Sequence, residues 1–230
     1  MRDLHGARRE RCVAVAGIAG VACMAGGMAA AVLAYDRPGG PGYSFANHFV
    51  SELGWAESSP RAWAFNGGVA LAGLLFTPIL WRVARLEGTR WGFVAGGVGV
   101  ATGLAGVLVG LVPMGGGGPH LVLAAVYFWL LMIGAILYTA VFRQAAREGR
   151  ARGLYRASRA LLAGCVAFTA APKGELMAAH RNFEAYALSA RPAVRLLALL
   201  EWCVIALAVV FVLVAAAHLL RRGDASSPIG

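Results

Sequence analysis

The chain is 230 residues long; 59% of its residues are hydrophobic and only 14% are charged. An ordinary soluble domain carries about 25% charged residues, so this composition excludes one. The glycines follow no three-residue period and lie inside apolar runs, which excludes a collagen-like chain and a polar disordered one. The composition therefore indicates a multi-pass membrane protein, and the formal net charge of +10 must be explained by where the basic residues lie.

Long apolar segments recur along the chain. A helix needs about 20 apolar residues to cross a hydrocarbon core of about 30 Å, because each residue rises about 1.5 Å. Five segments clearly reach this length. A shorter one begins near Ala157; it is counted as the sixth span, in which the helix extends past Lys173 toward Met177 or the bilayer is thinned. We predict an all-α integral membrane protein with one domain of six transmembrane helices, and a cytoplasmic tail at 221–230. The predicted spans are 12–34, 62–84, 91–113, 121–142, 157–177 and 196–220.

The arginines alternate between the two sides of these spans. Most of the 21 basic residues precede the first span, follow the sixth, or lie between the second and third or the fourth and fifth. The positive-inside rule therefore predicts that both termini are cytoplasmic. We expect the basic loops to face anionic membrane lipids, and we expect no nucleic-acid partner, since the most basic loop holds only Tyr155 as a stacking residue. The preference for Arg over Lys suggests a GC-rich bacterial genome, and hence a bacterial inner membrane.

The loop between the first two spans mixes polar and apolar residues. Its second half predicts a short amphipathic helix that lies in the membrane interface. On such a helix His48 and Glu52 are four residues apart and share a face, and Ser51 lies between them in sequence. Asn66 follows inside the second span, where its amide needs a hydrogen-bond partner because lipid offers none.

The third span carries glycines at alternating spacings of four and three residues, which places them on one helical face. Small residues let two backbones approach closely in lipid, where no hydrophobic drive brings helices together. We expect this face to pack against another helix; a groove for an acyl chain and a homo-oligomer contact are the alternatives. The glycines are Gly92, Gly96, Gly99, Gly103, Gly106 and Gly110.

The later extracytoplasmic loops add further titratable residues. His120 opens the fourth span, and His180 and Glu184 lie four apart before the sixth. We expect the polar residues of this side to converge in one cap. The candidate site comprises His48, Ser51, Glu52, Asn66, His120, His180 and Glu184.

Three interpretations of the cap stay open: a polar cap without chemistry, a site for a lipid headgroup or small ligand, and a catalytic or metal site. Imidazoles and carboxylates bind zinc, and the ligands would then be His48, His120 and His180. The chain has no HExxH or HxxxH pair, no GxSxG elbow and no phosphate-binding loop in context. We therefore predict no cofactor, leave zinc open, and assign no catalytic residue.

The run SELGWAESSPRAWAFNGG, residues 51–68, resembles the opening of the six-helix prokaryotic membrane family catalogued as domain of unknown function 998. The exit from the third span, LVPMGGGGPH, is similar to that family in Pro113 and His120, although Met114 and glycines stand where an acidic residue is usual. This resemblance covers nearly the whole chain and implies six helices. A more distant similarity is to the Frag1/DRAM group, of which some members are linked to lipid remodelling. The ceramidase-like intramembrane zinc hydrolases need an HxxxH pair, which this chain lacks.

These observations favour a membrane protein that binds or handles a lipid or small amphiphile at the extracytoplasmic cap. The alternatives are a metal-dependent intramembrane lipid hydrolase and a structural or assembly protein, so whether the chain is an enzyme stays open. The expected partners are membrane lipids, with a homo-oligomer through the glycine face as a second hypothesis.

Overall fold

The computed structural model describes residues 2–36, 42–114, 118–174 and 192–225. Within these ranges the chain forms six α-helices and two short 3-10 helices, and no strand. The prediction of an all-α fold is confirmed. The elements are α1 (Arg2–Leu33), η1 (Val50–Gly54), α2 (Ala62–Ala84), η2 (Arg85–Glu87), α3 (Arg90–Leu111), α4 (Gly118–Arg147), α5 (Arg152–Ala170) and α8 (Leu196–Ala225).

Local signals set the helix ends. Gly88, with a φ of 65°, takes the left-handed conformation that ends η2 and lets the chain turn into α3. Thr89 then caps α3, because its side-chain oxygen accepts a hydrogen bond of 3.0 Å from the backbone N–H of Gly92. At the end of α5 the backbone of Ala171 is extended and Pro172 follows, so this helix stops at Ala170 and does not run on to Met177.

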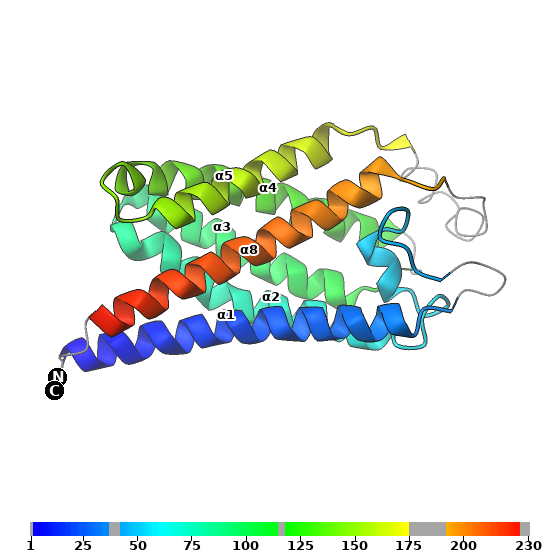
Figure 1. The fold of residues 1–230 in the computed structure, drawn as a ribbon, viewed down its shortest axis with the longest axis horizontal. Helices are drawn as coiled ribbons and strands as arrows, with labels where there is room; N and C mark the ends of the chain where they lie inside the picture. Colours follow the sequence, from blue (N-terminus) through cyan, green and yellow to red (C-terminus); the bar gives the residue numbers. More distant parts are fainter. Residues whose placement is uncertain (1, 37–41, 115–117, 175–191, 226–230) are drawn as a thin grey trace.

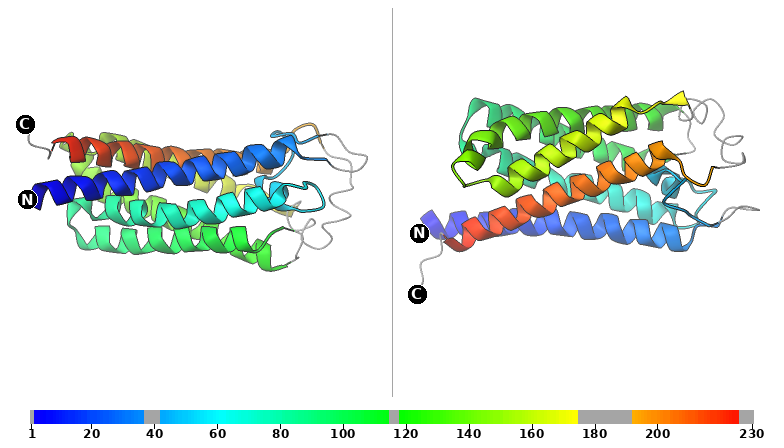
Figure 2. Two further views of the ribbon diagram at one scale, coloured as in Figure 1. Left: turned by 90° about the horizontal axis from the view of Figure 1, so that it is seen from below. Right: turned by 45° about the horizontal axis from the view of Figure 1, so that its top comes forward.

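The six helices run side by side along the long axis of the molecule (Figures 1 and 2). Each helix contacts the next one in the chain, and α8 contacts both α5 and α1, so the helices form a closed ring. Figure 1 shows both chain termini at the same end of this ring, with the loop before α2 at the opposite end. We call the end with the termini the basic end and the opposite end the cap end.

The outside of the ring is apolar. Five of the helices, all except α5, are long and apolar enough to cross a membrane. Trp63 and Trp91 are exposed near opposite ends of the bundle, as is typical of residues at the two membrane interfaces. The chain is therefore a multi-pass membrane protein. Whether α5 is a sixth crossing stays a prediction, since this helix begins with the arginine-rich segment RGLYR. The cytoplasmic location of both termini also stays a prediction.

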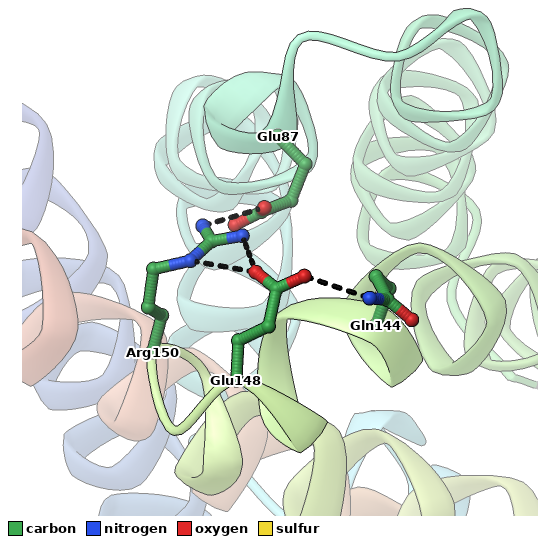
Figure 3. A network of polar contacts seen from close by, with 4 residues as sticks. All are labelled: Glu87, Gln144, Glu148 and Arg150. Carbon is green, nitrogen blue, oxygen red and sulfur yellow. Dashed lines mark hydrogen bonds and ion pairs between the residues drawn. The ribbon is translucent and has the colours of Figure 1, made fainter.

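Ion pairs tie the helices together at the basic end. Arg150, in the turn between α4 and α5, lies between two carboxylates (Figure 3). Its Nη1 donates to Glu87 at 2.9 Å and its Nε to Glu148 at 3.1 Å, and Gln144 also donates to Glu148. The hydrogen bonds from Arg150 lower the pKa of Glu148. Within the described residues, Arg82 pairs with Glu10, and Arg11 with Asp224. The acidic residues on this side thus serve to connect neighbouring helices.

The glycine face of α3 lies against α2. A Cβ added to Gly103 would lie 2.8 Å from the carbonyl oxygen of Gly73, and one added to Gly110 would lie 2.5 Å from that of Asn66. Real Cβ atoms do not approach backbone this closely, so the two helices can contact only because glycine stands there. The face that was a candidate for contact with a second copy is covered by α2, and by Tyr138 of α4, within the same chain.

The glycine contact can be tested by a pair of substitutions in α3. We expect Gly110→Ala to lower the free energy of unfolding by about 1–3 kcal/mol, because α2 must move to admit the methyl group. Gly97 has no atom within 4 Å of an added Cβ, so Gly97→Ala should leave stability unchanged or raise it slightly. Thermal unfolding in a neutral detergent measures both variants. Equal melting temperatures for the two would contradict the account.

Candidate site at the cap end

The loop between α1 and α2 folds over the cap end of the ring. Phe49, just before η1, is 2% exposed, and Leu53, within η1, is fully buried. Val50 and Leu53 pack in a cluster with Phe65 of α2 and Tyr35. The amphipathic helix predicted for the membrane interface is therefore wrong: the element is a single 3-10 turn whose apolar residues pack against the protein's own helices.

Two buried carboxylates hold the start of η1. Glu52 accepts a hydrogen bond of 3.0 Å from the backbone N–H of Phe49, and Glu201 of α8 accepts one of 2.8 Å from that of Val50. The first backbone donors of a helix have no partner within the helix, and a buried donor without an acceptor is costly. Glu52 therefore caps its own turn, whereas Glu201 ties that turn to the last helix.

His48 is packed among tyrosines just before η1. Its ring is 1% exposed, and its centroid lies 5.3 Å from that of Tyr35 and 5.0 Å from that of Tyr43. His48 Nδ1 lies 3.2 Å from both the N–H and the carbonyl oxygen of Ser44. The Tyr43 hydroxyl donates to the carbonyl oxygen of Phe49 at 2.9 Å, and burial raises the pKa of this hydroxyl. These contacts give His48 a structural role in shaping the loop.

Asn66 and His120 satisfy backbone groups at the ends of neighbouring elements. The Asn66 amide donates to the carbonyl oxygen of Gly54 at 3.0 Å, where η1 ends. The Nδ1 atom of His120 lies 2.7 Å from the carbonyl oxygen of Val112, where α3 ends. A carbonyl oxygen only accepts, so Nδ1 carries the proton. Among the described residues nothing bonds to the other ring nitrogen, Nε2, which is buried.

A cavity lies between the helices, directly below the cap. Its empty space comes to about 960 Å³, part of it open to the surroundings. Every helix of the ring contributes to the walls, and nearly all of the lining side chains are apolar or glycine, among them Met28, Phe76, Phe128 and Ile205. The exceptions are Ser51, Thr102, His120, Glu201 and the hydroxyl group of Tyr127, which follows His120 by seven residues on α4 and so lies about two turns farther from the cap. Thr102 lies deeper and donates to the carbonyl oxygen of Val98, so Ser51, His120 and Glu201 form the polar end of the cavity.

The five described residues of the candidate site all lie at the cap end, but they divide into two groups. His48, Glu52 and Asn66 hold the loop in place, whereas Ser51 and His120 line the cavity. His180 and Glu184 lie outside the described residues. Sequence reasoning missed Glu201, although a lone acidic residue in the first two turns of an apolar span is itself a signal of a functional position.

The described residues give little support for a metal centre. No three His, Cys, Asp or Glu side chains among them lie close enough together to hold an ion. Of the three histidines considered as zinc ligands, His48 and His120 direct Nδ1 at backbone atoms, and His180 lies outside the described ranges.

The capping role of Glu52 can be tested with two substitutions at one position. Glu52→Ala leaves the buried N–H of Phe49 without this acceptor, which should cost about 1–3 kcal/mol and speed hydrogen exchange in the loop. Glu52→Gln keeps a carbonyl oxygen and should be much milder. Hydrogen exchange measured by mass spectrometry compares both with Glu57→Ala, which alters an exposed residue of the same loop. Exchange in Glu52→Ala that matches Glu57→Ala would argue against the capping role.

Comparisons with known proteins place the whole bundle in a family. The family model described as "Protein of unknown function (DUF998)" matches residues 18–218, which run from α1 to near the end of α8. A search of curated proteins and a search of solved structures returned no match. The match covers most of the chain, including the loop between α1 and α2, the helix α3 and Glu201. The chain therefore belongs to the DUF998 family of proteins of unknown function.

Proposed function

We propose that this protein binds a single lipid or small amphiphile in the cavity, with the apolar part of the ligand between the helices and its polar group at the cap. The observation that supports this most is the composition of the cavity walls. They are apolar, except for Ser51, His120 and Glu201 at one end and Thr102 and the hydroxyl group of Tyr127 deeper inside. Ligand sites have this character: their walls are mostly apolar, with a few polar groups that fix the orientation of the ligand.

The empty space favours a ligand-binding protein over a purely structural bundle. Protein interiors are packed as densely as organic crystals, and unfilled apolar volume lowers stability. Small residues border the space where larger side chains would fill it, among them Ala124 of α4 and Ala208 of α8. The close glycine contact between α2 and α3 forms another part of the wall.

The depth of the cavity suits one alkyl chain. On α8 the lining residues extend from Glu201 to Val212, eleven residues along the helix. At about 1.5 Å per residue this is roughly 16 Å, or about half of a hydrocarbon core. A molecule that enters from the cap-side leaflet could thus lie with its chain between the helices and its polar end near the membrane surface.

We further propose that the ring crosses a bacterial inner membrane six times, with the basic end in the cytoplasm and the cap outside. The arginines concentrated at the basic end support this orientation through the positive-inside rule. In a chain whose native cysteines are replaced, Glu57→Cys should react with a membrane-impermeant maleimide in intact cells. Arg152→Cys should react only after permeabilisation. The opposite pattern would reverse the orientation.

Blocking the cavity should prevent ligand binding without harming the fold. Ala208 lines the cavity, whereas Ala206, two residues earlier on α8, is exposed on the outside of the ring. We expect Ala208→Trp to reduce labelling of the cavity walls by a photoactivatable long-chain alcohol at least fivefold, and Ala206→Trp to leave it unchanged. Peptide mapping by mass spectrometry locates the labelled residues. If labelling occurs only on the outer faces of the helices, or is the same in both variants, the proposal fails.

A further inference from the structure

Glu201, His120 and Ser51 give the polar end of the cavity several hydrogen-bond acceptors. Among the residues that the structure describes, neither Arg nor Lys lines the cavity. An anionic head group, such as a carboxylate or phosphate, would therefore meet no charged partner there. The charge and hydrogen-bonding capacity of Glu201 and His120 then determine which head group the cavity can accept.

Glu201 has an unused oxygen at the cavity. The residue is 8% exposed and lines the cavity, and its Oε2 accepts the hydrogen bond from Val50. Within the described part of the chain no group donates to Oε1, and the ion pairs found there do not involve Glu201. Burial in apolar surroundings favours the neutral form of a carboxyl group unless a positive charge lies beside it. A cationic ligand would supply that charge.

His120 adds a second acceptor at the same end. The residue is 7% exposed, and its Nδ1 proton points to the carbonyl oxygen of Val112. Burial disfavours a charged ring, so the neutral ring has a lone pair on Nε2, to which none of the described residues donates. Glu52 accepts from the N–H of Phe49, and Glu201 accepts from the N–H of the next residue, Val50. A second carboxyl group, that of Glu52, therefore lies close to the polar end of the cavity.

We propose that the ligand of the cavity is an amphiphile with a protonated amine as its head group. This inference rests on the proposed function and adds the class of ligand. The ammonium group would donate to Glu201 Oε1 and to His120 Nε2 or the Ser51 hydroxyl, while its alkyl chain lies between the helices. Anionic amphiphiles would be rejected, because their head groups can only accept hydrogen bonds and would lie beside Glu201 and Glu52.

Three amphiphiles with the same chain and different heads test this inference. The protein is placed in phosphatidylcholine nanodiscs at neutral pH, and dodecylamine, dodecanol and dodecanoate compete with the photoactivatable alcohol for the cavity walls. We expect dodecylamine to displace the probe at a concentration at least tenfold lower than dodecanoate does, with dodecanol between them. Equal potency of dodecylamine and dodecanoate, or a preference for dodecanoate, overturns the inference. Absence of cavity labelling by the alcohol instead overturns the proposed function.

Variants then assign the preference to a residue. Glu201→Gln keeps an oxygen to accept from Val50, so the cap should stay folded, but it removes the negative charge. We expect it to reduce the advantage of dodecylamine over dodecanoate at least fivefold while dodecanol competes as before. Glu57→Gln, at an exposed site on the same side, should leave the ratio unchanged. An unaltered ratio in Glu201→Gln would overturn the assignment of the amine to this carboxylate.

Discussion

The hydrogen bond from the Val50 amide to the Glu201 carboxylate joins parts of the chain that are 151 residues apart. It connects the loop between the first two helices to the last helix, and so closes the cap end of the ring. Other hydrogen bonds join the same loop to the residues just before α8. The N–H of Arg195 donates to the carbonyl oxygen of Ala46 at 2.8 Å, and the Asn47 side chain donates to the carbonyl oxygen of Pro192. The Val50 amide and the Glu201 carboxyl group are both buried, and a buried donor without an acceptor is costly, so this bond must be made within the protein. The same bond places a carboxylate at the mouth of an apolar space.

The packing of the ring explains why that space exists. Glycines on α2 and α3 bring these two helices into backbone contact, and α2 also contacts α8 across the ring. The cavity lies between the helices of the ring, and small residues form part of its walls. At the basic end, Arg150 and the other ion pairs hold the same helices together, so both ends are fixed while the middle of the cap-side half stays open. A frame held at both ends in this way would keep the proposed binding site formed in the absence of a ligand.

The sequence was informative where one physical requirement dominates. Length and apolarity were enough to locate the helices, since only a helix satisfies its backbone in lipid. Apolarity did not predict the environment of η1. Apolar residues four apart, such as Phe49 and Leu53, are found both on helices at a membrane surface and on helices packed in a protein interior. His48 and Glu52 lie at the cap end, in the loop where the sequence places them. The packing of His48 against Tyr35 and Tyr43 follows from how that loop folds back, which no spacing encodes. Glu201 was missed for the same reason: its partner Val50 lies 151 residues away in the sequence, and only the closed ring brings α8 next to the loop before α2.

The central claim is that an amphiphile occupies the cavity with its head at Glu201. The most direct test is an experimental structure of the protein in phosphatidylcholine nanodiscs with dodecylamine present. The account predicts elongated density along α8 from the level of Glu201 toward Val212, with the amine within about 3 Å of Glu201 Oε1. A cavity closed by repacked side chains, or density whose head group lies away from Glu201, would contradict it.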